Sequence, residues 1–295
     1  MQRNYFFEYT NKPNTEDFLI PTQEDFEEKY KDYFNELRNA AKYDKLTIIE
    51  KFKSTLLKSQ FLKLLHDKNN EYSDCAIIHY AAKYNRPQAI QALVGHLNIE
   101  ERLGVFLLSY KTKCTTLHFT STINVTDDSN CSFEAASRIK ELLYLDENHS
   151  FWLILLSAQQ ECLDTAVHYA ARQNEAKLLN LLSGGLSSDE WLSILSIPND
   201  NNRTAMHVYF INMNKTIDGS QKEFISAFRG SIKDEAWVNF LISKKVLQNL
   251  SPDNQLEHYC FQQIVWGLSS ELADRLMSSW QTSKLNITGS KFKSF

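Results

Sequence analysis

Four histidines recur along the chain with similar neighbours, and they are the first residues that could carry chemistry. They are His79, His118, His168 and His207, and two of them open the same tetrapeptide, His-Tyr-Ala-Ala. Histidine is a common zinc ligand, and zinc ligands must lie within about 2 Å of one ion. If each histidine lies on its own helix in a stack, neighbouring helices are about 10 Å apart, so the imidazoles do not converge. We therefore expect each imidazole to hydrogen-bond backbone groups of its own or the adjoining loop, and we expect no metal site.

Two of these histidines follow a cysteine by four residues, as Cys75 with His79 and Cys114 with His118. This spacing places a thiol and an imidazole on one helix face, the arrangement of an activated cysteine nucleophile. A working nucleophile also needs a group that orients the base and an oxyanion hole. Nothing in the sequence supplies them, and the cysteines fall where the helices begin. We interpret both pairs as structural.

An enzyme of another kind remains the alternative interpretation. It would be a cysteine-dependent hydrolase or transferase that uses Cys131, Cys260 or His258, with the repeats described below docking its substrate. The chain contains no G-x-x-x-x-G-K, G-x-G-x-x-G, H-E-x-x-H or C-x-x-C motif. These motifs mark the common nucleotide, zinc-protease and redox sites, so we expect no cofactor.

Composition favours helices and excludes several classes of protein. The 295 residues include 8 Gly and 5 Pro, too few for glycine-rich phosphate loops or a turn-rich β-sandwich. A net charge of -4 gives no field that would collect nucleic acid or an anionic membrane surface. The longest apolar stretch, 151–156, is too short to span a bilayer, and the N-terminus lacks an apolar signal-peptide segment. Five scattered cysteines fit a reducing compartment. We expect a soluble, cytoplasmic monomer with no nucleic-acid partner and no membrane insertion.

The histidines belong to a repeat, which supplies the elements that position them. In the units of Arg38, His79 and His168, small residues follow by two and three positions and apolar residues by ten to fourteen, which predicts two helices. The units of His118 and His207 keep this register, with insertions of 11 and seven residues before the second helix. A third short apolar helix precedes the next histidine, at 61–65, 105–109, 151–156, 191–197 and 237–242. The unit positions are Arg38, His79, His118, His168 and His207, spaced by 41, 39, 50 and 39 residues. An insertion of 11 residues in the third unit accounts for the longest spacing.

The turn between the first two helices carries Asp44, Asn85 or Asn174 in place of glycine. Asn and Asp tolerate the left-handed conformation that ends many helices, so we expect it there, and we expect glycine to replace either asparagine without loss. The aromatic residues that directly follow three histidines, Tyr80, Phe119 and Tyr169, are expected in the core. Residues 1–36 are expected to form an aromatic and acidic N-terminal cap, 37–230 the five repeats, and 231–295 a degenerate terminal unit around His258 with a polar tail.

The pattern T-x-x-H-x-A-A, complete in Thr165–Ala171, together with paired aliphatic residues on the second helix, resembles the ankyrin repeat. The resemblance implies an all-α, ankyrin-like helical solenoid with lengthened repeats of about 39 residues and helical caps. The usual proline before the histidine is missing. A short helix and a polar loop, such as 198–203, are expected where ankyrin units place a β-hairpin finger. Long, degenerate units of this kind look like those of effectors that intracellular bacterial pathogens deliver into host cells.

The resemblance also implies where a partner binds. In an ankyrin-like stack, residues four and five positions after the histidine line the concave face. Tyrosine and arginine often anchor protein interfaces, so this row predicts a protein partner. For an effector the partner would be a host protein, reached by translocation without a classical signal peptide. The insertions at 123–134 and 212–220 could also carry function, and a purely structural spacer is a further reading. The candidate residues are Lys42, Tyr43, Lys83, Tyr84, Thr122, Ile123, Arg172, Gln173, Ile211 and Asn212.

Overall fold

A computed structural model describes residues 20–67, 75–109, 113–121, 132–144, 149–212, 220–249 and 255–291. Within these ranges every regular element is a helix and no strand is present, so the expected all-α class is confirmed. Cys131, Thr122 and Ile123 lie outside the described residues, as does most of both insertions.

The helices stack in three rows, and each unit contributes one helix to every row. The first row holds α1 (Gln23–Lys42), α4 (Ile77–Lys83), α7 (Thr116–Thr120), α10 (Ala166–Gln173), α13 (Ala205–Asn212) and the 3-10 helix η1 (Val246–Asn249). The second holds α2 (Leu46–Thr55), α5 (Pro87–Val94), α8 (Ser132–Leu143), α11 (Ala176–Ser183), α14 (Ser220–Arg229) and α16 (Gln255–Val265). The third holds α3 (Lys58–His66), α6 (Ile99–Phe106), α9 (Ser150–Ser157), α12 (Ser188–Leu195), α15 (Asp234–Ser243) and α17 (Ser270–Lys291).

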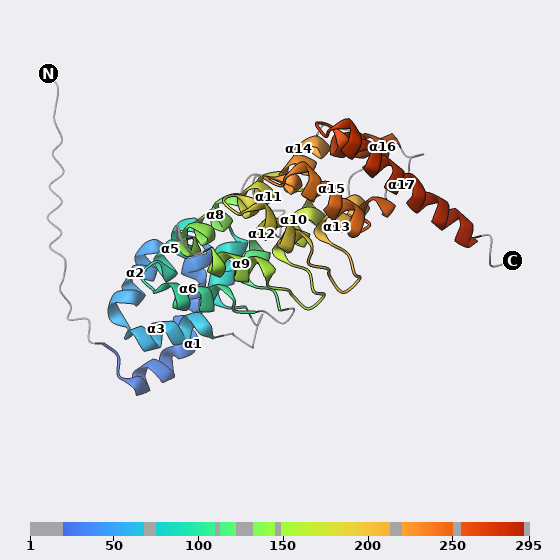
Figure 1. Cartoon of the computed structure of the whole chain (residues 1–295). Helices are drawn as coiled ribbons and strands as arrows, with labels where there is room; N and C mark the ends of the chain where they lie inside the picture. The colour runs from blue at the N-terminus through green and yellow to red at the C-terminus, as the bar shows by residue number, and fades with distance from the viewer. Residues whose placement is uncertain are drawn as a thin grey trace, which may run out of the picture.

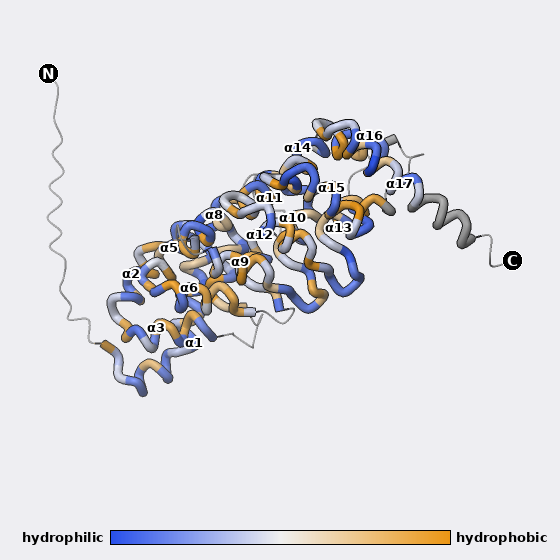
Figure 2. Tube along the Cα trace, in the orientation of Figure 1, coloured by the Kyte–Doolittle hydropathy of each residue, from blue (hydrophilic) through white to orange (hydrophobic). Residues whose placement is uncertain are grey.

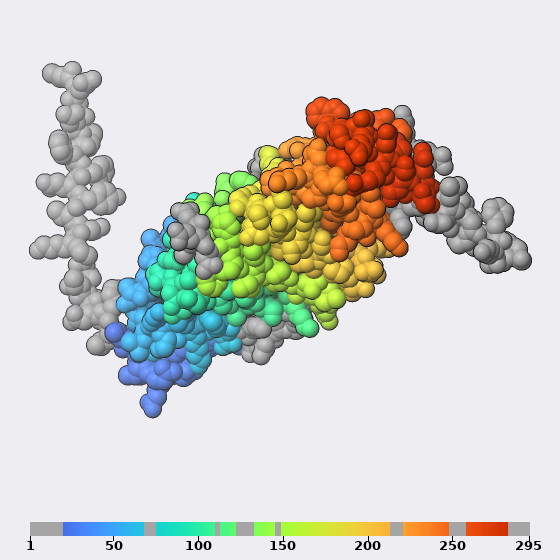
Figure 3. Space-filling model, in the orientation of Figure 1, coloured from blue at the N-terminus to red at the C-terminus, as the bar shows by residue number. Residues whose placement is uncertain are grey.

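The stack is elongated, with α1 to α3 at one end and α16 and α17 at the other (Figure 1). Each helix of the first two rows contacts the next helix of its own row. In the space-filling view the units follow one another along a single long body (Figure 3). The short apolar segments predicted at 61–65, 151–156 and 237–242 lie within helices of the third row, and most of 191–197 lies in α12. The segment predicted at 105–109 is only partly helical, because α6 begins earlier and ends at Phe106.

One core runs the length of the stack. Hydrophobic and hydrophilic stretches alternate within most helices, as in helices that bury one face (Figure 2). Alanines that follow the histidines, such as Ala81 and Ala170, are fully buried and let the first-row helices approach closely. Tryptophans of the third row link units. The indole N–H of Trp152 donates to the carbonyl oxygen of Leu182 (3.2 Å) in the next unit, and Trp191 repeats this contact one unit later.

The expected left-handed turns are confirmed. The φ angles of Asp44, Asn85 and Asn174 are 56°, 48° and 59°. The backbone N–H of Asn174 donates to the carbonyl oxygen of Ala171 and so satisfies one of the last carbonyls of α10.

The two ends extend the repeat. The boundary predicted between 36 and 37 falls inside α1, so the described part of the N-terminal segment is the beginning of the first unit's own helix. After α15, η1 lies against α13, α16 against α14, and α17 against α15. These three elements form a sixth unit. Because η1 takes the first-row position, His258 on α16 belongs to the second row and does not occupy the place of the recurrent histidines.

Candidate functional site

The recurrent histidines link each unit to the next. The Nδ1 atom bonds the start of its own unit, and the Nε2 atom bonds the loop that precedes the next unit. In His168, Nδ1 accepts the backbone N–H of Thr165 (3.1 Å), and Nε2 lies 3.0 Å from the carbonyl oxygen of Arg203 in the following loop. His118 makes the same contacts, with Thr115 at 3.2 Å and the Asp164 carbonyl at 3.0 Å. The predicted backbone hydrogen bonds of the histidines are therefore confirmed.

These contacts fix the neutral form of each imidazole. In His118 and His168, Nε2 faces a carbonyl oxygen, which only accepts, so Nε2 carries the proton and Nδ1 accepts from the N–H and hydroxyl groups of the threonine. Burial lowers the pKa of His118 to about 4. Burial also lowers the pKa values of His168 and His207, so these three imidazoles stay uncharged at neutral pH.

The cysteine and histidine pairs do not form a nucleophile and base in this arrangement. Both nitrogens of His79 and His118 are engaged by backbone groups, so neither can take a proton from a thiol. The Sγ atom of Cys114 lies 3.8 Å from the hydroxyl of Tyr169. Cys260 is fully buried, whereas His258 on the same helix is exposed. In the described ranges no three metal-ligating side chains gather in one place.

A tight turn closes each of the two loops that precede α10 and α13. The N–H of Gln160 donates to the carbonyl of Asp164, and the N–H of Leu163 donates to the carbonyl of Gln160, both at 2.9 Å. The loop 199–203 has the same pair of bonds at the same distances. In both turns the fourth residue is left-handed, with φ of 58° at Leu163 and 56° at Asn202. The polar loop expected at 198–203 is thus a closed turn of hairpin type.

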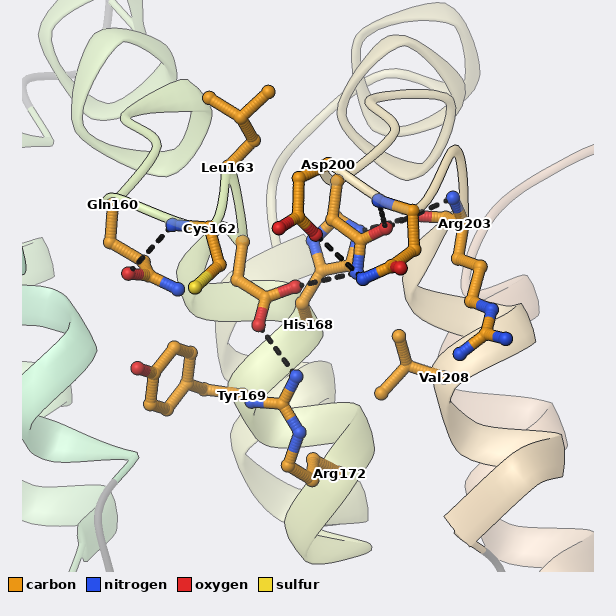
Figure 4. Close-up of polar contacts among 12 residues, drawn as sticks. Gln160, Cys162, Leu163, His168, Tyr169, Arg172, Asp200, Arg203 and Val208 are labelled. Atoms are coloured by element: carbon orange, nitrogen blue, oxygen red, sulfur yellow. Dashed lines mark hydrogen bonds and ion pairs between the residues drawn. The ribbon is translucent and has the colours of Figure 1, made fainter.

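A buried carboxylate joins these two loops (Figure 4). Asp164 is 3 % exposed, and its two oxygens accept from Arg172 Nη2 at 2.5 Å and from Asn199 Nδ2 at 2.9 Å. Its backbone carbonyl accepts from His118, so one residue contacts three consecutive units. The contacts hold Arg172 beside the ring of Tyr169, with 5.2 Å from the guanidinium carbon to the ring centroid.

The described candidate residues lie where the first-row helices end. Lys42 and Tyr43 end α1, Lys83 and Tyr84 end α4, Arg172 and Gln173 end α10, and Ile211 and Asn212 end α13. All are exposed or half-buried, with Tyr43 55 % and Ile211 47 % exposed.

Cations and aromatic rings lie next to one another at the C-terminal ends of the first-row helices. The ammonium nitrogen of Lys42 lies 4.8 Å from the ring centroids of both Tyr43 and Tyr84, so it bridges two units. Hydrogen bonding with Tyr43 raises the pKa of Lys42, and the same bond lowers the pKa of Tyr43. The Arg38 guanidinium lies 5.7 Å from the ring of Tyr80 in the next unit. Each contact is the geometry of a cation–π pair.

The expectation that Tyr80, Phe119 and Tyr169 lie in the core is wrong. All three are half-buried, and each ring lies against a residue of the preceding first-row helix. Phe119 lies 4.8 Å from the ring of His79, and Tyr169 meets His118 edge-on at 5.5 Å. The sequence held a signal for this placement, since positions one, four and five after a histidine share one helix face.

We call the residues at these three positions the aromatic-cationic row. Its described members are Asn39, Lys42, Tyr43, Tyr80, Lys83, Tyr84, Phe119, Tyr169, Arg172, Gln173, Val208, Ile211 and Asn212.

Two surface grooves lie away from this row. One, of about 530 Å³, is lined by α1 and α2 residues such as Tyr33, Phe52 and Leu56 at the first end of the stack. The other, of about 490 Å³, lies between α12 and α15. Neither groove is lined by cysteine or histidine, so neither supports the cysteine-dependent enzyme.

Comparison of the chain with models of known protein families finds no match, and comparison with curated proteins finds none either. Among the described helices, none has both the length and the apolar character needed to cross a bilayer. The assignment of function therefore rests on the geometry of this chain.

Proposed function

We propose that the chain is a protein-interaction module that binds its partner along the aromatic-cationic row. The observation that carries the proposal is the bridge of Lys42 between Tyr43 and Tyr84, which prepares an exposed surface across two units. Tyrosine presents a large, rigid contact area at low entropic cost, and tyrosine and arginine are enriched among the residues that dominate interface energies.

We further propose that the stack is a solenoid of the ankyrin type. Three observations support this proposal: the T-x-x-H pattern, the repeated histidine contacts between units, and the hairpin-type turns before α10 and α13. In such a solenoid the first-row helices line the concave face, where an extended partner can contact several units at once. The resemblance to lengthened ankyrin units of bacterial effectors supports an effector role with a host protein as partner.

Affinity capture with surface variants tests the interaction. The double variant Tyr43→Ala with Tyr84→Ala removes the two rings that hold Lys42. The matched control, Phe133→Ala with Ile154→Ala, removes two side chains that are 40 % and 46 % exposed on α8 and α9. We expect the tyrosine variant to lose partners that wild type and control both retain. If the tyrosine variant captures every wild-type partner in equal amount, the proposal is wrong.

A further inference from the structure

We infer that the aromatic-cationic row binds an extended, acidic segment of a protein chain. This inference rests on the proposed function and adds the chemistry of the partner to it. The chain as a whole carries a net charge of -4. In contrast, the positions of the aromatic-cationic row contain no Asp or Glu in any of the five units. They do include Lys42, Lys83 and Arg172. Arg38, which takes the place of the histidine in the first unit, lies over the ring of Tyr80 in the row. The row is therefore a cationic strip on an acidic protein, and charge complementarity favours an acidic partner.

The cations of the row are held in place. Arg38 and Lys42 rest against the rings of Tyr80, Tyr43 and Tyr84. Arg172 is anchored by Asp164 yet keeps 37 % of its side chain exposed. Because packing already restricts these side chains, a carboxylate that meets them costs less side-chain entropy than one that must order free lysines.

The spacing suits an extended peptide. Neighbouring first-row helices in such a stack are about 10 Å apart, and an extended chain rises about 3.3 Å per residue. A carboxylate at every third residue would therefore meet each unit in turn. The residues between them would lie over the half-exposed rings of Tyr80, Phe119 and Tyr169, which favours apolar side chains at those positions.

The same observations argue against a nucleic acid. A nucleic-acid strand carries a charge on every nucleotide and requires a matching density of cations. The row offers three cations over five units, Lys42, Lys83 and Arg172, on a chain of net negative charge. A peptide that mixes carboxylates with apolar residues matches this composition better.

Fluorescence anisotropy with defined probes tests the inference. The acidic probe is a labelled 12-residue peptide made of four repeats of glutamate, leucine and serine. The matched probes replace each glutamate with glutamine or with lysine, and a 12-nucleotide oligothymidylate serves as a polyanion of another class. All are titrated with the full chain at low and at physiological ionic strength.

We expect the acidic peptide to bind at least about tenfold more tightly than the glutamine peptide at low salt, with the difference shrinking as salt rises. The variant Lys42→Glu with Lys83→Glu should weaken binding of the acidic peptide by about tenfold or more. Its control, Lys177→Glu with Lys233→Glu, makes the same charge change at exposed positions of α11 and before α15, and should change affinity by less than about twofold. Urea unfolding of each variant checks that its stability matches the wild type.

Three results would overturn the inference. They are equal binding of the glutamate and glutamine peptides, equal weakening by both charge-reversal variants, and tighter binding of oligothymidylate that the Lys42 and Lys83 variant abolishes. If partner capture depends on Tyr43 and Tyr84 but the glutamine peptide binds as well as the acidic one, only this inference fails. If capture does not depend on those tyrosines, the proposed function itself fails.

Discussion

The side-chain oxygen of Asn85 accepts a hydrogen bond from the backbone N–H of Ala135, 2.8 Å away and 50 residues later in the chain. Ala135 lies in the first turn of α8, where backbone N–H groups have no partner within the helix. Asp44 makes the equivalent contact with the N–H of Ala89 in the first turn of α5, at 2.9 Å. Each residue therefore has two roles. It ends its own helix in the left-handed conformation, and it caps a second-row helix of the next unit.

Because the Asn85 side chain makes this hydrogen bond, Asn85 and Asn174 should respond differently to glycine, and the expectation that glycine replaces both without loss no longer holds for Asn85. Within the described residues the Asn174 side chain makes no hydrogen bond, so Asn174→Gly should be neutral or slightly stabilising. Asn85→Gly keeps the backbone conformation but loses the cap, and should lower the free energy of unfolding by about 1 kcal/mol. Urea unfolding of both variants measures the difference. Equal stabilities would show that the contact with Ala135 contributes nothing.

Leu163 has a left-handed backbone with φ of 58° and a side chain that is 44 % exposed. An aliphatic residue in this region costs about 1–2 kcal/mol, and the neighbouring loop has Asn202 at the same position. We expect Leu163→Asn to raise the free energy of unfolding by about 1 kcal/mol. The reciprocal change, Asn202→Leu, should lower it by a similar amount. A destabilising Leu163→Asn in thermal unfolding would mean that the leucine side chain contributes more through contacts than its backbone costs.

Acid should destabilise the stack through His118. Burial lowers the pKa of this residue from 6.5 to about 4, so between these pH values the unfolded chain binds a proton that the folded chain does not. Stability is therefore fully present above about pH 6.5 and falls as the pH drops toward 4, by about 3 kcal/mol for this residue. His168 and His207, whose pKa values are also lowered, act in the same direction.

The difference between wild type and His118→Gln isolates this effect. We expect the variant to be less stable at pH 7.5 and to lose less stability than wild type between pH 7.5 and 5. His66→Gln makes the same substitution at an exposed position of α3 and serves as the matched control. Parallel pH profiles for wild type and His118→Gln, measured by urea unfolding, would contradict the assignment.

Asp164 should be the most sensitive polar position of the stack. Asp164→Ala removes the acceptor for Arg172 and leaves the amide of buried Asn199 without its partner, which should cost about 2–4 kcal/mol. The exposed neighbour Asp200 provides the control, and Asp200→Ala should cost less than about 0.5 kcal/mol. Chemical unfolding with equal losses for the two variants would exclude a special role for the buried carboxylate.

Local sequence patterns were sufficient to predict the buried helix faces and the turns between helices. These patterns are the small residues after most of the histidines, the paired aliphatics on the second helix and the Asn or Asp at the turn. They reflect the 3.6-residue period and the backbone preferences of single residues. They predicted the three helices of each repeat and the left-handed φ of Asp44, Asn85 and Asn174.

The contacts between units became visible only in the folded stack. Three kinds of contact join residues far apart in the chain, and no local period encodes them. They are the cap of Asn85 on α8, the bond of Trp152 to Leu182 and the contacts of Asp164 with three units. The half-buried state of Tyr80, Phe119 and Tyr169 likewise depends on how neighbouring first-row helices pack, which a local pattern does not specify. The sequence predicted a degenerate terminal unit around His258, but it did not show which element opens that unit. Its first element, η1, lacks the histidine pattern, and its place is defined by the contacts of η1, α16 and α17 with the unit before it.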